Sequence, residues 1–274
     1  MNDLLKKLAP ISSAAWEEIE DEAKETLKAT LAARRVVDFN GPLGWDKGVV
    51  ETGRIKSISG PRTGVDARVR TARPLVELRT DFALARAELE AIDRGAKDAD
   101  LDPVRDAAYK LAMAEDSAVF HGFAAGDIEG IGQAASGATL TIPTKYEEYP
   151  HVVAEALRKL NEKGVGGPYA IVLGPRCYEG LTKTAAGGLP VINHVQRLVD
   201  GPIVRAQAVD GAVVLSLRGG DFCLTVGRDI SIGYASHDAK SVNLYMVESF
   251  TFQTLGDEAA IPLAYSRAKK KYRT

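Results

Sequence analysis

The sequence predicts a protein of the α+β class, in which helical and strand patterns occupy different stretches of the chain. Three observations indicate this class. Apolar residues recur at helical spacing in the first 35 residues, a polar stretch of alternating residues follows, and the last third is mostly a succession of strand patterns. With 274 residues, 45% of them hydrophobic and 26% charged, the chain is long enough to bury a core as one large domain or two interleaved ones.

Composition and charge exclude several classes of function. The net charge of −2 provides no global positive field that would gather nucleic acid, and no run of eighteen apolar residues indicates a membrane span. The basic run at residues 266–274 is expected to be a solvated tail. Cys177 and Cys223 stand apart, without a CxxC motif or a secretory leader, so we expect a cytoplasmic protein without a disulfide framework.

The first expected element is an amphipathic helix over residues 13–35. Ser13 is its expected N-cap, glutamates occupy its early turns, and Arg34 and Arg35 suit the negative end of the helix dipole. The Gly-Pro sequence that follows should end the helix. Its apolar stripe consists of Trp16, Ile19, Ala23, Leu27 and Leu31.

Residues 46–74 form a polar excursion of alternating strand patterns in which apolar residues occur singly. A strand pair of this kind has no core of its own and is unstable in isolation. We therefore expect it to pack on something else, either on its own domain or on a neighbouring copy of the chain.

The rest of the chain alternates helices and strands and ends in strands. Helices are expected at residues 82–95, 101–120 and 147–163, with loops and a short strand at 121–145. A buried strand is expected within 166–175, followed at 176–199 by a helix, a glycine-rich loop and a helical turn. The later strands are expected at 202–209, 211–217, 222–226, 229–236, 241–255 and 260–265.

The glycines of residues 218–221, RGGD, lie between two of these strand patterns, so we expect a hairpin turn there. A phosphate-binding loop is excluded because no helix follows the glycines. Ser231 is not expected to be catalytic, because Asp229 replaces the first glycine of a nucleophile elbow and a strand follows.

The sequence predicts no metal site, no cofactor and no catalytic residue. Glu148 and His151 have a metal-like spacing, but there is no second copy of the pair. Glu115 and Asp116 are adjacent, and nothing in the sequence positions them as an acid and a base. The four histidines are far apart in the sequence: His121, His151, His194 and His237.

Several stretches carry a family resemblance over nearly the whole chain. They are LAPISSAAWEEIEDEAKETLKATLAARRVVDFNGPLGW, RPLVELRTDFALARAELEAIDRGAKDADL, AEDSAVFHG with IEGIG, GPYAIVLGP, and RGGDFCLTVGRDISIGY with VESFTFQ. From about residue 4 to residue 265 they resemble, in order, the encapsulins, the linocin-type shell proteins of bacterial nanocompartments. The resemblance implies the major capsid fold of tailed phages, of the Hong Kong 97 type. It also implies a structural shell subunit that assembles with itself and is not an enzyme.

The resemblance divides the chain into the parts of a capsid subunit, and it would explain the polar excursion and the N-terminal helix by packing against neighbouring subunits. The implied parts are an N-terminal helix and arm facing the lumen (1–45), an E-loop (46–78), a P-domain (79–133 and 225–265), an A-domain around the five-fold axis (134–224) and a basic tail (266–274).

The resemblance also implies a groove on the inner wall for a short C-terminal peptide of a cargo enzyme, either a peroxidase or a ferritin-like iron oxidase. Apolar side chains would receive apolar anchors of the peptide, and charged ones would set its register. For Arg34 and Asp38, a pair one helical turn apart is the alternative interpretation. The implied groove residues are Leu31, Arg34, Val37, Asp38, Asp229, Ile230 and Ile232.

A second implied site is the loop that lines the five-fold pore. Its small residues suit a crowded symmetry axis, where the loop would serve as a gate or as an inert lining, and His194 would titrate near neutral pH. The implied pore residues are Ala185, Ala186, Gly187, Gly188, Leu189, Pro190 and His194.

Two other functions stay open at this stage. A prophage major capsid protein shares the fold, although the short E-loop, the groove residues and the lack of a scaffolding extension favour a nanocompartment with T=1 symmetry. An antibacterial or proteolytic protein, as linocin-type names suggest, has no catalytic constellation to support it.

Overall fold

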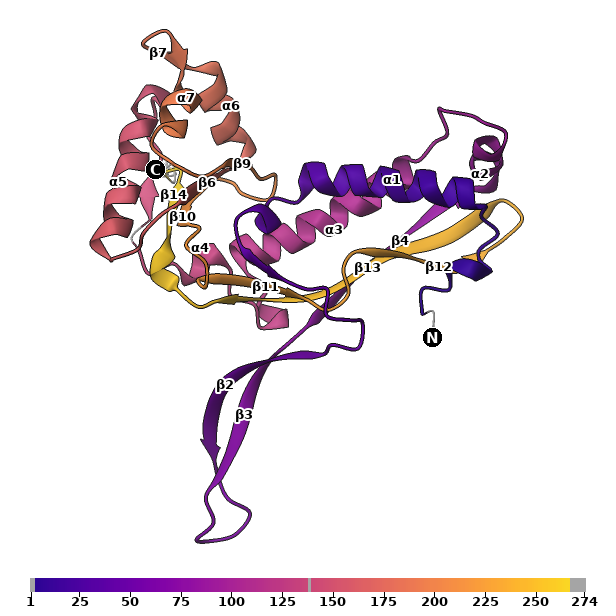
Figure 1. Cartoon of the computed structure of the whole chain (residues 1–274), viewed down its shortest axis with the longest axis horizontal. Coiled ribbons are helices and arrows are strands. Elements are labelled where there is room, and N and C mark those ends of the chain that lie inside the picture. The colour runs from indigo at the N-terminus through magenta and orange to yellow at the C-terminus, as the bar shows by residue number, and fades with distance from the viewer. Residues whose placement is uncertain (1–2, 138, 267–274) are drawn as a thin grey trace, which may run out of the picture.

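The computed structural model describes residues 3–137 and 139–266, and two five-stranded sheets contain most of its strands (Figure 1). The long strand β13 organises the first sheet: β11 and β12 pair with it in succession along one edge, and β4 pairs with the other edge. The short strand β1 adds to β11 in parallel. The strands are β1 (Asp38–Asn40), β4 (Val76–Ala85), β11 (Phe222–Val226), β12 (Ser231–His237) and β13 (Ser241–Thr254).

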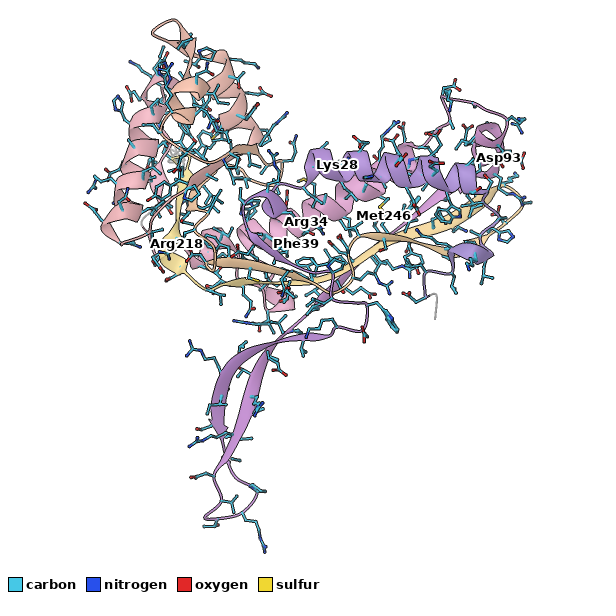
Figure 2. The ribbon with its side chains drawn as sticks, viewed as in Figure 1. Lys28, Arg34, Phe39, Asp93, Arg218 and Met246 are labelled. Carbon is cyan, nitrogen blue, oxygen red and sulfur yellow. The ribbon has the colours of Figure 1, made fainter. Side chains whose placement is uncertain are left out.

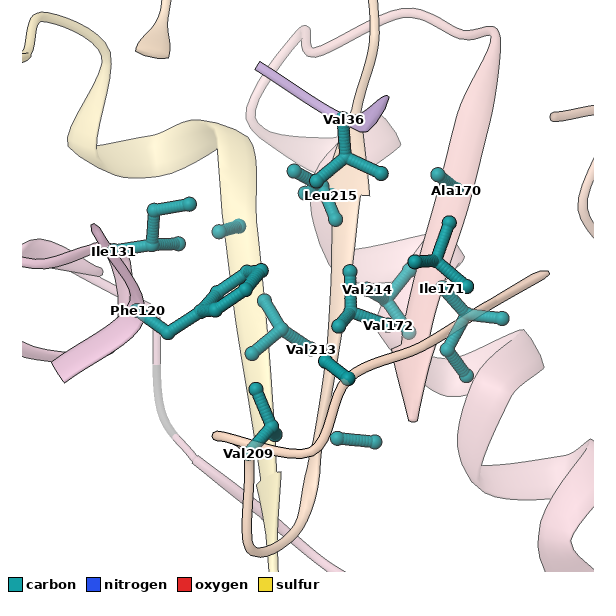
Figure 3. Close-up of a cluster of buried hydrophobic side chains, with 14 of the residues drawn as sticks. Val36, Phe120, Ile131, Ala170, Ile171, Val172, Val209, Val213, Val214 and Leu215 are labelled. Carbon is teal, nitrogen blue, oxygen red and sulfur yellow. The ribbon is translucent and has the colours of Figure 1, made fainter. Parts of the chain in front are cut away.

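The second sheet has the strand order β5-β14-β10-β6-β9. Its central strand pair is apolar and buried throughout, as the continuous apolar run of β6 predicts. Figure 3 shows Val213, Val214 and Leu215 of β10 beside Ile171 and Val172 of β6. The strands are β5 (Leu140–Thr141), β6 (Tyr169–Leu173), β9 (Ile203–Arg205), β10 (Ala212–Ser216) and β14 (Ala260–Ala264).

Helices cover both sheets. The long helices α1 and α3 lie side by side over one face of the first sheet, and α5, α6 and α7 surround the second (Figure 1). No helix of the described residues is both long and apolar enough to cross a bilayer. The α-helices are α1 (Ser13–Thr30), α2 (Arg86–Asp93), α3 (Asp102–His121), α4 (Ile131–Ala134), α5 (Tyr149–Glu162), α6 (Pro175–Lys183) and α7 (Val191–Gln196). Short 3-10 helices are η1 (Lys6–Leu8), η2 (Ala33–Arg35), η3 (Ala124–Gly126), η4 (Tyr146–Glu148) and η5 (Asp257–Ala259).

The polar excursion is a two-stranded hairpin of β2 (Val49–Ile58) and β3 (Ala67–Pro74) that projects away from both sheets (Figure 1). No residue of either strand is buried, so the expectation that this segment has no core of its own is confirmed. The hairpin carries six basic and two acidic residues. Since the whole chain has a net charge of −2, the remainder carries −6.

Two predicted helices have wrong boundaries. The first helix ends at Thr30, and its N-cap is Ser12, whose hydroxyl oxygen accepts the Ala15 N–H at 3.1 Å. The segment predicted as a helix from residue 82 remains in strand β4 until Ala85, because it pairs with β13 over ten positions. Helical propensity does not record such long-range pairing.

The turn at residues 218–221 is not a hairpin, which corrects the prediction. β10 pairs with β6 and β14 in the second sheet, whereas β11 pairs with β1 and β13 in the first, so the turn connects two sheets. Gly219 and Gly220 both have positive φ, 83° and 84°, a backbone conformation that suits glycine. The expected boundary at residue 224, between the A-domain and the second part of the P-domain, does not coincide with the division into sheets. β11, which spans this boundary, lies in the first sheet, and β14, from the expected P-domain, lies in the second.

The bounds of the three remaining predicted helices agree closely with the prediction for two of them and in part for the third. α3 and α5 lie within two residues of their predicted bounds, and α6 occupies the first part of 176–199. Cys177 and Cys223 are free thiols. Of the basic run at 266–274, residues 267–274 lie outside the described residues.

Deleting residues 50–72 should leave both sheets folded, because no residue of β2 or β3 is buried. If copies of the chain pack on one another through this hairpin, as the family resemblance implies, the shortened chain should fail to assemble into particles. Thermal unfolding would report the fold, and light scattering would report particle size. Particles of wild-type size from the shortened chain would contradict the prediction.

Candidate functional site

A groove of about 670 Å³ lies between α1 and the start of β12. Its floor is apolar and its rim carries charged side chains. In Figure 2, Lys28 lies on α1, Arg34 lies in the turn after it, and Met246 lies beneath the helix on the sheet. The lining residues are Lys6, Glu20, Ala23, Lys24, Leu27, Lys28, Leu31, Arg34, Arg35, Asp229, Ile230, Ser231, Ile232 and Met246.

The apolar stripe of α1 forms one wall of the groove. Ile19 and Ala23 of this stripe are buried against the body of the protein. Farther along the same stripe, Leu27 and Leu31 are only partly covered and line the groove. The amphipathic pattern that anchors the helix therefore also supplies the apolar wall of the groove.

One end of the groove is formed by Arg34, which lies at the centre of a cluster of carboxylates. Its Nε donates to both carboxylate oxygens of Glu115 at 2.9 Å, and its Nη1 donates to Asp229 Oδ1 at 2.7 Å. Its Nη2 lies 3.3 Å from Glu248 Oε2. Glu115 and Glu248 have no exposed side-chain surface, and that of Arg34 is 17% exposed. One guanidinium thus joins α3, β13 and the loop before β12 to the end of α1.

Burial and proximity change the proton affinities in this cluster. Burial alone would lower the pKa of Arg34, but hydrogen bonds and charges from Glu115 and Asp229 raise it above its ordinary value. Burial, then the charge of Glu115, raises the pKa of Glu248 well above its ordinary range. Glu248 Oε1 has no hydrogen-bond partner among the described residues. A neutral Glu248 beside the Arg34–Glu115 ion pair therefore leaves less unpaired charge buried.

Asp116, the neighbour of Glu115 on α3, holds the chain where α1 ends. Its carboxylate accepts the N–H groups of Ala32 and Ala33, each at 2.9 Å. Burial raises the pKa of Asp116 to about 7, although these two N–H bonds oppose the rise. The two bonds explain why the helix stops at Thr30 instead of continuing to residue 35, and they place Arg34 in the groove.

Five of the seven predicted groove residues come together in the structure: Leu31, Arg34, Asp229, Ile230 and Ile232. The other two, Val37 and Asp38, line a separate cavity of about 200 Å³, which shares Arg35 with the groove. The proposed helix pair of Arg34 and Asp38 is wrong, because Arg34 lies in the 3-10 turn η2 and Asp38 begins strand β1. Asp38 instead accepts the N–H of Gly220 at 2.6 Å, within the turn that connects the sheets.

Sequence reasoning missed the buried acids of the site. Glu115 and Glu248 complete the Arg34 cluster, yet they lie about 80 and 214 positions from Arg34 in the chain. The available signal is that Glu248 follows Met246 and Val247 in β13, and that Glu115 follows a mostly apolar run of α3 at residues 111–114. Leu27 and Met246 of the floor were also missed, since nothing local distinguishes them from core residues.

The predicted pore loop forms a separate feature at the far end of the second sheet (Figure 1). Strands β7 (Ala185–Ala186) and β8 (Leu189–Pro190) flank a two-residue turn in which Gly187 and Gly188 have φ of 58° and 81°. The space around both glycines is open. His194 Nε2 lies 2.9 Å from the Ala186 carbonyl oxygen, which ties the last turn of α7 to the loop.

Within the described ranges, no three His, Cys, Asp or Glu side chains are arranged to hold a metal ion. Ser231 donates its hydroxyl hydrogen to the Asp229 carbonyl oxygen at 2.7 Å. The groove offers apolar surface, fixed charges and main-chain groups to a ligand.

Solved structures define the class of protein. The virus-like particle of Pyrococcus furiosus has a TM-score of 0.62 at 15% identity, covering 89% of this chain and 97% of its own. The capsid of cyanophage P-SCSP1u has a TM-score of 0.54 at 10% identity, covering 88% of this chain and 89% of its own. The chain has the phage capsid fold of the Hong Kong 97 type, as predicted; at these identities, the likeness extends to the fold alone.

Sequence relatives define the family. The Linocin_M18 family, described as encapsulating protein for peroxidase, matches residues 1–251. The type 1 encapsulin shell protein of Rhodospirillum rubrum is 56% identical over 270 residues, which cover 96% of each chain. The chain belongs to this encapsulin family, and the resemblance inferred from the sequence is confirmed.

Replacing Glu248 with Gln should alter how stability depends on pH. Because the folded-state pKa of Glu248 lies above its ordinary value of 4.5, the folded chain keeps a proton that the unfolded chain loses as pH rises. This contribution to stability is therefore present at low pH and lost as pH rises toward the folded-state pKa. Glutamine cannot ionise, so the melting temperature of Glu248→Gln relative to wild type should increase between pH 5 and pH 7.5.

Scanning fluorimetry of the two proteins in the same oligomeric form would measure this difference. Glu25→Gln, at an exposed residue of α1, is the control and should show little change relative to wild type. A difference for Glu248→Gln that stays constant or falls with pH would contradict the assignment of a neutral Glu248.

Proposed function

We propose that copies of this chain assemble into a closed icosahedral shell of T=1 symmetry that encloses a cargo enzyme. The observation that carries the proposal is the 56% identity to an encapsulin shell protein over 96% of each chain, together with the capsid fold. The exposed hairpin adds support, because its apolar residues and its excess of positive charge need a partner surface. A neighbouring copy, whose remaining residues are acidic overall, has the complementary charge.

The groove beside α1 is our proposed docking site for a C-terminal segment of the cargo enzyme, on the face that would line the lumen. Leu27, Leu31, Ile230, Ile232 and Met246 offer an apolar surface to the segment. Each buried apolar anchor contributes about 1.5–3 kcal/mol, so one segment binds weakly. Many grooves on one shell and several segments on one oligomeric cargo would raise the overall affinity.

A peroxidase is the cargo best supported, because the family description names one; a ferritin-like iron oxidase is the second candidate from the resemblance. The proposed role of the chain itself is structural. A prophage capsid is less well supported, since the cyanophage capsid shares only 10% identity with this chain. Packaged nucleic acid in purified shells would favour the capsid alternative.

We further propose that the β7–β8 turn lines the pore at the five-fold axis. Leu189 is 38% exposed beside the turn and does not need the positive φ of the two glycines. Leu189→Trp should therefore narrow the pore without straining the loop, and it should slow turnover of a small substrate by enclosed cargo. Leu189→Ala is the matched control. Equal turnover in both shells at equal cargo loading would contradict the pore assignment.

Replacing Ile230 with Asp should abolish cargo loading without preventing assembly. The new carboxylate would lie in the apolar floor and beside Asp229, which weakens an apolar anchor and adds repulsion. The measurement is co-expression of the shell with a fluorescent reporter that carries the C-terminal 30 residues of the enzyme co-purifying with wild-type shells. Purified Ile230→Asp shells should retain less than a tenth of the wild-type reporter.

Ile230→Val is the matched control, since it keeps an apolar floor and should load the reporter normally. Equal loading of intact Ile230→Asp and wild-type shells would place the docking site elsewhere.

A further inference from the structure

The start of β12 presents an unpaired strand edge to the groove. Along one edge of β13, β11 and β12 follow each other, so β12 has β13 as its only strand neighbour among the described residues. The residues Ile230, Ser231 and Ile232, at this end of β12, all line the groove. An unpaired edge carries N–H and C=O groups that accept a further strand.

Two sets of hydrogen bonds determine which main-chain groups of β12 face outward, that is, away from β13. The Ser249 N–H donates to the Arg228 carbonyl at 2.9 Å, so the main-chain groups of Ser249 face the edge of β13 that β12 shares. In an antiparallel ladder these directions alternate, so Val247, two positions away, also faces β12 and meets Ser231 there. The next residue of β12, Ile232, must then face away from β13.

The N-terminal arm independently confirms which residues of β12 have main-chain groups that face away from β13. The Tyr234 N–H, two residues beyond Ile232, donates outward to the Leu4 carbonyl at 2.8 Å. The arm thus occupies the outer edge of β12 at Tyr234. Neither the N–H nor the C=O of Ile232 has a main-chain partner outside the β12–β13 ladder among the described residues, and Ile232 lines the groove. An unpaired N–H and C=O at the edge of a strand can hydrogen-bond to a further strand.

The groove has the length of a short extended segment. The wall from Glu20 to Leu31 rises about 16 Å at 1.5 Å per residue, which equals about five residues of extended chain. Ion pairs close both ends: Lys6 to Glu20 at 2.5 Å, and Arg34 to Asp229 at 2.7 Å.

We propose that the cargo segment binds as an added β-strand on the outer edge of β12, with one of its residues exchanging N–H and C=O hydrogen bonds with Ile232. The inference rests on the proposed docking function and specifies the chemistry of its partner. The partner is an extended segment of about five residues that has a free amide N–H opposite Ile232. Its alternate side chains point toward Leu27 and Leu31 on α1, so apolar residues are required at every second position.

An N-methyl scan of the cargo segment tests the added strand. The probe is a fluorescent synthetic copy of the C-terminal segment used in the reporter, with one backbone amide methylated in each variant, titrated into empty wild-type shells. Methylation opposite Ile232 removes a hydrogen bond and adds a clash, so it should weaken binding about tenfold or more. Methylation one residue to either side, where the N–H points away from β12, should change affinity less than threefold.

The outcomes separate this inference from the docking proposal. An affinity that falls at alternate positions supports the added strand. Binding of the unmodified probe together with a uniform scan overturns the added strand and leaves the docking site in place. Failure of the unmodified probe to bind any shell, while the reporter also fails to load, overturns both.

A variant of the shell gives a second test. Ile232→Pro removes the outward N–H and leaves the ladder bonds of the flanking residues to β13, a position in an edge strand that tolerates proline. Shells of this variant should assemble and bind the probe about tenfold more weakly than Ile232→Val shells, which keep the N–H. Equal binding by the two assembled variants would overturn the proposal. If Ile232→Pro does not assemble, the N-methyl scan decides the matter.

Discussion

The Arg34 guanidinium is the interaction on which the groove depends. It binds Glu115 of α3 and Asp229 of the loop before β12, and it lies beside Glu248 of β13. Each of these carboxylates comes from a different element, so their common partner sets the distance between the end of α1 and the sheet. Two of the three acids are fully buried, and removing the guanidinium would leave buried charge unpaired, which costs several kcal/mol.

The position of Arg34 depends in turn on the interruption of α1. Residues 31–35 contain no helix breaker, and their composition would allow another helical turn. Asp116 binds the N–H groups of Ala32 and Ala33 and thereby competes with continued helix formation. A single buried carboxylate on α3 thus decides where the groove ends and which way Arg34 points.

The long strand β13 imposes the second constraint. It pairs with β4 over ten positions and carries β11 and β12 in succession on its other edge. Because β11 and β12 divide that edge between them, the chain crosses from one to the other at residues 227–230, where Asp229 and Ile230 face the groove. The same arrangement leaves β12 with β13 as its only strand neighbour in the described part of the chain. The hairpin of β2 and β3 is different, because none of its strand residues is buried.

The sequence by itself determined the class of fold, the amphipathic α1, the coreless hairpin and, through family resemblance, five of the residues that gather in the groove. These features are local or periodic: an apolar stripe at helical spacing and an alternation without an apolar face can be recognised without knowing what they contact. Only the tertiary structure decided that RGGD joins two sheets, that residues 82–85 belong to β4, and that Glu115 and Glu248 meet Arg34. Strand pairing and buried charge compensation join residues that lie far apart in the chain, and the energies that select such partners arise only when the core excludes water.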